Sequence, residues 1–246
     1  MKRVLSFLLV ALVIVSPVYG NDSIRVAETD TVKFTPQQLI VPGALVAVGA
    51  LGVAVPPLVQ ARKWINKEIG RHDIVPVDDY LQYAPLAGYL FLDFAGMKSR
   101  RPFVDRVIVG ATATILTVGL THGIKWCVNE QRPHSERMNS FPSGHSAMAF
   151  VGAELLRQDY GPWVGAAGYL AATAVGVMRI VRGYHWLNDV VASAGIGILC
   201  ARAGEWLLPF NRRWLGLDRK RGEAAVLVPT YSPFDGSVNL SFAMTF

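Results

Sequence analysis

One histidine and one aspartate in this sequence have the spacing of a catalytic pair. His185 precedes Asp189 by four residues, within a polar stretch that separates two apolar runs. If the second run forms a helix from about Tyr184, this spacing places the imidazole and the carboxylate on one face, within hydrogen-bond distance. A carboxylate so placed fixes the tautomer of its histidine and leaves the other ring nitrogen free as a base or nucleophile. The pair alone proves little, because histidine and aspartate at helical spacing also occur by chance.

Three cations and a helix-opening turn add the features of an anion site. Lys125, Arg132 and Arg179 carry permanent positive charges, and arginine offers a fork of donors that matches phosphate oxygens. Ser143 and Gly144, at the predicted start of a helix, offer a hydroxyl and unpaired backbone N–H groups to the same anion. These residues predict a site for a phosphate dianion. The alternative is that the cations flank membrane spans as interfacial anchors, which is the usual role of a loop cation.

The elements that must position these residues are membrane spans. Of the 246 residues, 52% are hydrophobic and 17% are charged, which is too apolar for an ordinary soluble domain. The fold class that we expect is all-α, a transmembrane helical bundle of five to six spans. Its apolar segments cover about residues 35–61, 80–96, 104–121, 143–156, 162–178 and 188–208. Prolines and glycines interrupt the first segment, which we expect to be a broken or partly inserted helix.

Alternation of the spans brings the polar clusters together. Consecutive spans cross in opposite directions, so the end of the third segment, the start of the fourth, the end of the fifth and the start of the sixth lie on one side. Lys125 with Arg132, the turn at 142–145 and the stretch at 179–189 adjoin these four ends. We therefore expect the three clusters to meet at one membrane surface.

The two ends of the chain differ from its apolar middle. Residues 1–20 have the charged start, apolar run and small-residue end of a signal peptide, with an uncleaved signal anchor as the alternative. We predict a polar linker over 21–36, the membrane-embedded phosphate-binding domain over 37–210, and a basic segment with a C-terminal tail over 211–246. Two runs rich in β-branched and aromatic residues, on either side of 232–236, predict a small β-hairpin in this tail.

Charge and cysteine patterns exclude other classes of partner. The net charge of +6 comes mostly from short segments between apolar runs, which favours loops that face lipid or cytoplasm, so we expect no nucleic-acid partner. Cys127 and Cys200 lack metal-site spacing, and we expect two free, buried thiols. Two further histidines, His122 and His134, are accompanied by no His-x-x-x-His or carboxylate-rich pattern, so we expect no metal site.

The polar clusters also match a family pattern. Lys125 is followed by Arg132-Pro133, then by Pro-Ser-Gly-His at 142–145, then by Arg179 with His185 and Asp189. In this order and spacing the chain resembles the type 2 phosphatidic acid phosphatase superfamily, over about residues 80–208. The resemblance implies a membrane-embedded phosphatase that acts on a lipid phosphate and needs no cofactor and no metal.

The resemblance also implies a role for each site residue. His185 is the nucleophile that forms a phosphohistidine, Asp189 orients it, and His145 is the catalytic acid and base. The phosphoryl oxygens are bound by Lys125, Arg132, Ser143, the Gly144 amide and Arg179. The chain has Met178 where the family usually has serine, so one hydroxyl near the phosphate is absent, and we expect altered contacts rather than lost activity.

Loop charges favour a periplasmic site in a bacterial inner membrane. Basic residues at 97–101 and after the sixth segment predict that those ends are cytoplasmic. A cleaved signal peptide conflicts with this orientation unless the first apolar segment does not cross fully, which we adopt as a hypothesis.

The expected partner is a phosphorylated lipid substrate. We favour lipid A or undecaprenyl pyrophosphate, with phosphatidylglycerol phosphate and phosphatidate as alternatives. A different class of alternative is a non-catalytic lipid-binding or transport protein of the same fold. The sequence leaves the oligomeric state open.

Overall fold

The computed structural model describes residues 34–69, 71–72, 74–217, 225–231 and 238–244. The chain divides into residues 1–31 and 32–246, and all described residues lie in the second unit. The predicted signal peptide and nearly all of the predicted linker lie outside them. The helical elements are, in chain order, η1 (Pro36–Leu39), α2 (Ile40–Ala54), α3 (Pro56–Ile69), α4 (Asp78–Leu81), α5 (Ala84–Phe91), α6 (Phe103–Val128), α7 (Gly144–Tyr160), α8 (Pro162–Val181) and α9 (Leu187–Trp214).

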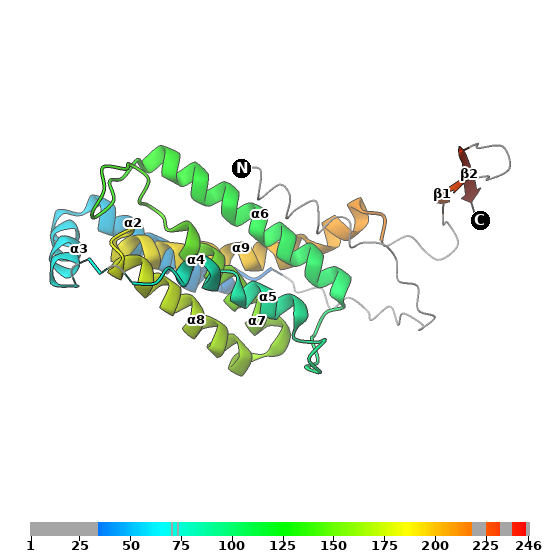
Figure 1. The fold of residues 1–246 in the computed structure, drawn as a ribbon, viewed down its shortest axis with the longest axis horizontal. Helices are drawn as coiled ribbons and strands as arrows, with labels where there is room; N and C mark the ends of the chain where they lie inside the picture. Colours follow the sequence, from blue (N-terminus) through cyan, green and yellow to red (C-terminus); the bar gives the residue numbers. More distant parts are fainter. Residues whose placement is uncertain (1–33, 70, 73, 218–224, 232–237, 245–246) are drawn as a thin grey trace. The chain divides into compact units, whose positions relative to one another are not determined.

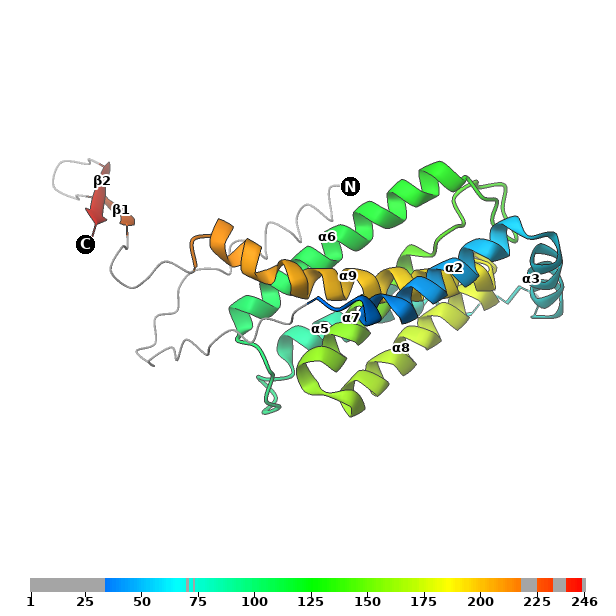
Figure 2. The same ribbon diagram turned by 180° about the vertical axis from the view of Figure 1, so that it is seen from behind.

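Helix α7 is the centre of the bundle. It packs against α5, α6, α8 and α9, and twelve of its 17 residues are buried. Figures 1 and 2, which show the bundle from opposite sides, both place α7 among these neighbours. Leu155 of α7 shares one apolar core with Val109 of α6 and Ala201 of α9. The first residues of α7 are therefore held in place by the packing of the whole bundle.

Small residues set the distance between these helices. A Cβ atom at Gly152 of α7 would lie 2.4 Å from the backbone nitrogen of Leu86 in α5. At Gly197 of α9 it would lie 2.6 Å from the carbonyl oxygen of Ala147 in α7. Neither distance is tolerated by real side chains, so glycine is required where these backbones meet.

Four helical segments of the described residues are long and apolar enough to cross a membrane: Pro36–Ala54, Phe103–Val128, Pro162–Val181 and Leu187–Trp214. The predicted count of five to six spans is not confirmed. Helix α5 has only 8 residues, which is about 12 Å of helix. Helix α7 has 17 residues and carries the charged residues Glu154, Arg157 and Asp159 near its end. Its apolar residues pack against other helices of the protein on several sides.

The first apolar segment is interrupted, as the sequence predicts. Helix α2 ends at Ala54, Val55 is extended, and Pro56 opens α3. Proline is tolerated at a helix start, where no partner is needed for its missing N–H group, and it cannot continue the preceding helix. Pro42 does not break α2 because it lies in the first turn.

The connections of α6 to α7 and of α8 to α9 lie at the same end of the bundle. Asn129 ends α6 in the left-handed conformation, with φ of 50°, and Gly183 turns the chain after α8, with φ of 68°. Helices α7 and α9 then begin where α6 and α8 end (Figure 1). This arrangement confirms the predicted meeting of the polar clusters.

The C-terminal tail contains the two described strands. β1 (Ala225–Tyr231) pairs antiparallel with β2 (Val238–Met244), so that Ala225 lies opposite Met244 and Tyr231 opposite Val238. This ladder lies where the sequence predicts a hairpin. The residues of the intervening turn are outside the described ranges.

Candidate active site

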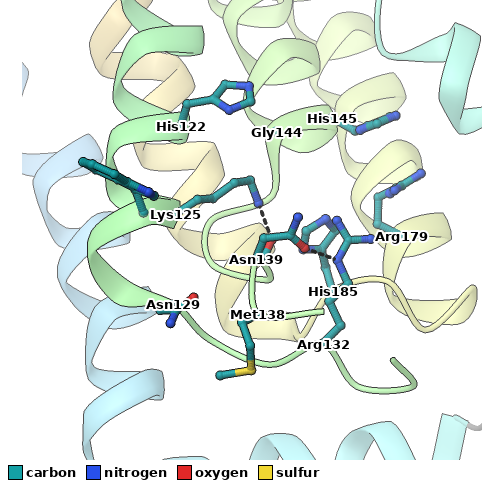
Figure 3. A pocket seen from close by; sticks show the side chains of 11 residues that line it. His122, Lys125, Asn129, Arg132, Met138, Asn139, Gly144, His145, Arg179 and His185 are labelled. Carbon is teal, nitrogen blue, oxygen red and sulfur yellow. Dashed lines mark hydrogen bonds between the residues drawn. The ribbon is translucent and has the colours of Figure 1, made fainter. Parts of the chain in front are cut away.

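A pocket of about 430 Å³ opens at the end of the bundle where α7 and α9 begin. Six of the eight predicted site residues line it: Lys125, Arg132, Gly144, His145, Arg179 and His185. They come from the end of α6, the 129–143 connection, the start of α7, the end of α8 and the 182–186 connection (Figure 3). Lys125 and His185, which are 60 positions apart in the sequence, therefore line the same cavity.

His185 and Asp189 form the predicted pair. The Nδ1 atom of His185 lies 3.3 Å from Oδ2 of Asp189, and the two side chains are 2% and 0% exposed. Asp189 lies in the first turn of α9, where its Oδ2 also accepts a hydrogen bond from the Trp186 backbone N–H at 2.9 Å. The carboxylate therefore both caps the helix and holds the imidazole. With Nδ1 facing the carboxylate, Nε2 is the ring nitrogen left for chemistry.

His185 is neutral in this environment. Burial lowers its pKa well below the usual value, and the positive charges of Lys125, Arg132 and Arg179 lower it further. A neutral imidazole whose Nδ1–H donates to Asp189 has a lone pair on Nε2 near pH 7. That is the protonation state that a nucleophile or a general base requires.

The three predicted cations surround the pocket. Lys125 Nζ donates to the carbonyl oxygens of Asn139, at 2.7 Å, and of Ser140, at 3.2 Å. Arg132 Nε donates to the side-chain oxygen of Asn139 at 2.8 Å (Figure 3). Arg179 is 5% exposed. Burial lowers the pKa of Arg132, and the neighbouring charges of Arg179 and Arg137 lower it further, which reflects the excess of positive charge around this loop.

Gly144 and Ser143, which are neighbours in the chain, differ in their relation to the pocket. Gly144 lines the pocket, and a Cβ atom built on it would meet nothing within 4 Å. Its amide belongs to the first turn of α7, where backbone N–H groups have no partner within the helix. Ser143 is fully buried and its hydroxyl caps α7, accepting from the Ser146 N–H at 3.4 Å. Ser143 is not among the residues that line the pocket.

Two aspartates that the sequence did not single out contact the site. Asp78 and Asp79 open α4, and Arg179 donates to both, at 2.7 and 3.1 Å. Asp79 also lies 3.1 Å from Nε2 of His145. Burial alone would raise the pKa of Asp78, but hydrogen bonds from Arg179 and Arg182 outweigh it and lower the pKa. The signal in the sequence was two acids at a predicted helix start, which is common on solvent-exposed helices as well.

The second group that the sequence missed is Ser140. Its hydroxyl donates to Oδ2 of Asp189 at 2.5 Å, and the residue is fully buried. It lies in the 129–143 connection, 49 residues from Asp189. A serine two residues before the Pro142–His145 turn carries no local sign of this contact.

Arg182 contacts the same elements from outside the first pocket. It donates to Asp78 at 2.6 Å and its guanidinium lies 4.8 Å from the centre of the Tyr184 ring. Arg132 and Arg179 approach the same ring, at 5.8 and 4.3 Å. Tyr184 is thus the common contact of three arginines.

Among the described residues, no group of three or more histidine, cysteine, aspartate or glutamate side chains has the geometry of a metal site. Both cysteines are free thiols. Cys200 is buried, but Cys127 is exposed, so the prediction of two buried thiols was wrong for Cys127. It lies near the end of α6, on a face that the bundle does not cover.

Parts of the chain are similar to known proteins. Residues 135–213 match the model of the PAP2 superfamily. The chain is 36% identical over 135 residues to Lipid A 1-phosphatase from Porphyromonas gingivalis, which covers 53% of this chain and 30% of that protein. The chain thus spans less than a third of the length of this relative.

Two solved structures are also similar. One is LpxE from Aquifex aeolicus, with 27% identity and a TM-score of 0.46, covering 59% of this chain and 93% of that chain. The other is a transmembrane PAP2 type phosphatidylglycerolphosphate phosphatase from Bacillus subtilis, with 21% identity and a TM-score of 0.34, covering 90% and 99%. Residues 135–213 of the chain are thus similar to the PAP2 superfamily.

Proposed function

We propose that this protein is an integral membrane phosphatase that releases phosphate from a lipid through a phosphohistidine intermediate. The observation that carries the proposal is the pocket in which His185, backed by Asp189, meets Lys125, Arg132 and Arg179. A neutral imidazole beside three cations is suited to attack an anion that the cations hold. The match of residues 135–213 to the model of the PAP2 superfamily supports the same reaction.

In the first step, Nε2 of His185 attacks phosphorus and the bond from phosphorus to the lipid oxygen breaks. His145 gives its proton to the departing oxygen. In the second step, His145 takes a proton from water, the water oxygen bonds to phosphorus and the bond to His185 breaks. Asp189 holds the proton on Nδ1 and stabilises the charge that the ring acquires as it forms the bond to phosphorus.

The phosphoryl oxygens are held by Lys125, Arg132, Arg179 and the Gly144 amide. Charge spreads over these oxygens in the transition state, so preorganised donors stabilise it more than the ground state. In the structure Arg179 is bound by Asp79, which therefore occupies part of the place that an anion takes on binding. A direct contact from Ser143 to the phosphate stays a prediction, and its capping of α7 supports an indirect role through the Gly144 amide.

The substrate that we propose first is the phosphate of lipid A, with undecaprenyl pyrophosphate second. The name of the Porphyromonas gingivalis relative supports lipid A. Trp126 and Met138 line the same pocket and are 91% and 47% exposed, which offers apolar surface to an acyl or prenyl chain beside the phosphate. Phosphatidylglycerol phosphate and phosphatidate are the alternatives within this reaction class.

We propose that residues 37–210 form the membrane-embedded phosphatase domain, in a bacterial inner membrane with the site on the periplasmic side. The four candidate spans support the membrane location. The basic residues at 97–101 support the orientation, since they lie at the end of the bundle opposite the pocket.

Phosphate release by the purified protein tests this function. The panel contains lipid A, undecaprenyl pyrophosphate, phosphatidylglycerol phosphate and phosphatidate in detergent, with mass spectrometry of the lipid product. We expect one class to lose a phosphate, and His185→Ala to lower the rate by about a thousandfold or more. Arg213→Gln, at the exposed end of α9 away from the pocket, is the matched control and keeps the wild-type rate.

Two results would contradict the proposal. Release of phosphate by His185→Ala at the wild-type rate would contradict a phosphohistidine intermediate at His185. Binding of phosphorylated lipid without release from any member of the panel would favour a non-catalytic lipid-binding protein.

A further inference from the structure

A second pocket, of about 290 Å³, adjoins the first. Its lining includes four arginines, Arg71, Arg132, Arg137 and Arg182, together with His134 and Tyr184. Among the described residues that line it there is no carboxylate. Arg182 pairs with Asp78, which lies outside the lining, and the wall keeps the charges of Arg132 and Arg137. A cavity of this size with a net positive wall concentrates anions.

The walls of this second pocket are held in place. The ring of Tyr184 lies against the guanidinium groups of Arg132 and Arg182. Gly183 packs so closely on His134 that a Cβ atom would lie 2.4 Å from the imidazole. The backbone N–H of Arg132 donates to the carbonyl oxygen of Arg137 at 3.1 Å, which fixes the two arginines relative to each other. The donors are therefore arranged before any ligand binds.

Arg132 belongs to both pockets. An anion in the first pocket and an anion in the second would each lie beside the same guanidinium, which has five N–H donors and can serve two partners. Burial lowers the pKa of Arg132, the charges of Arg179 and Arg137 lower it further, and this excess of positive charge favours a second anion. One molecule with two anionic groups fits this arrangement better than two separate ions, because it loses its freedom of motion only once on binding.

We propose that the second pocket is a subsite for a second phosphate group of the lipid substrate, one that is bound but not hydrolysed. This inference rests on the proposed function and narrows its substrate class to lipids with two phosphates. The His185 pocket takes the phosphate that is released. Arg71, Arg137 and Arg182 hold the other, and Arg132 contacts both.

The test compares lipids that differ by one phosphate. One pair is an isoprenyl diphosphate with its monophosphate, in which the second phosphate is adjacent to the first. The other is an acylated glucosamine disaccharide with phosphates at both ends or only at the reacting end. For each pair the ratio of kcat/KM for the two members is measured in wild type, in Arg137→Gln and in Arg71→Gln.

We expect wild type to prefer the two-phosphate member of one pair, which also identifies where the second phosphate lies. Loss of one charge-assisted contact lowers this preference about tenfold in Arg137→Gln and in Arg71→Gln. Arg213→Gln, which removes an arginine outside both pockets, keeps the wild-type ratio. Melting temperatures in detergent show whether each variant is folded.

An equal loss of kcat/KM for both members of a pair would overturn the subsite, because it would mean that the arginines act only as a general positive field. An unchanged ratio in both variants would overturn it as well. In either case wild type still releases phosphate and the proposed function stands. No release from any of the four lipids by wild type would instead refute the proposed function and the subsite with it.

Discussion

At the scale of single residues, the site depends on one carboxylate oxygen. Oδ2 of Asp189 has three neighbours: the imidazole of His185, the hydroxyl of Ser140 at 2.5 Å and the N–H of Trp186 at 2.9 Å. The contacts with Ser140 and Trp186 fix the position of the carboxylate, and the carboxylate in turn fixes the imidazole of His185. The orientation of His185 is therefore set by residues that do not line the pocket.

Replacement of the carboxylate by an amide tests this chain of contacts. Asp189→Asn has the same shape but no longer favours the Nδ1–H tautomer and cannot stabilise the charged ring, so we expect kcat to fall by about a thousandfold or more. The matched control is Ser193→Ala, which removes a hydrogen bond to the Asp189 carbonyl oxygen and leaves the carboxylate intact. We expect wild-type kcat in the control. Equal losses in both variants would assign the effect to the helix start rather than to the carboxylate.

The burial of His185 also predicts a pH effect on stability. Its pKa in the folded protein lies well below the value of about 6.5 that it has when unfolded. Below pH 6.5 the unfolded chain therefore binds a proton that the folded protein does not, and the free energy of unfolding decreases as pH falls. We expect the melting temperature of wild type to drop more between pH 7 and pH 5 than that of His185→Asn. Parallel curves for the two proteins would contradict a buried neutral histidine.

At the scale of elements, the sequence predicted the four helix ends that surround the pocket, but it did not predict the contribution of helix α4. The starts of α7 and α9 and the ends of α6 and α8 meet as expected, because alternation of spans requires it. Helix α4 was not predicted as part of the site. Asp78 and Arg179 are 101 residues apart, and no local period or spacing relates a charged connection to a distant helix end.

The number of membrane spans could not be predicted from the pattern of hydropathy either. Helix α7 is apolar because it is buried among four other helices, and α5 is apolar over a length too short to cross a bilayer. Apolar runs of intermediate length do not distinguish a buried helix from a span.

The close approach of α5 and α7 gives a prediction for stability. In Gly152→Ala the new Cβ would lie 2.4 Å from the Leu86 nitrogen, so the helices must separate, and we expect a loss of about 1–3 kcal/mol and a lower melting temperature. The control is Gly119→Ala in α6, where a Cβ meets nothing within 4 Å and alanine favours the helix by about 0.5–1 kcal/mol. A control as unstable as Gly152→Ala would show that the contact is not the cause.

At the scale of the whole bundle, the two ends differ in how their charges are balanced. Away from the pocket, the buried Arg101 and Arg106 are paired with Glu205 and Asp93, respectively. Near the pocket, Arg179 and Arg182 share Asp78, whereas Lys125 and Arg132 bond to neutral oxygens of the 129–143 connection. Paired charges stabilise one end of the bundle, and the excess of positive charge at the other end attracts an anion.

The orientation of these two ends in the membrane is tested by labelling. A cysteine is placed at the exposed Ser135, near the pocket, or at the exposed Lys98, near the other end, in a protein with Cys127→Ser. An impermeant maleimide added to intact spheroplasts is expected to label Ser135→Cys and to label Lys98→Cys only after lysis. The reverse pattern would place the pocket in the cytoplasm.

The central claim is that His185 carries the phosphoryl group, and trapping the intermediate tests it most directly. A lipid substrate with ³²P in the reacting phosphate is mixed with the purified protein and quenched in alkali within milliseconds, since phosphohistidine survives base. We predict label on the protein at His185 in wild type and none in His185→Ala. Phosphate release by wild type with no label on His185, or labelling that persists in His185→Ala, would contradict the mechanism.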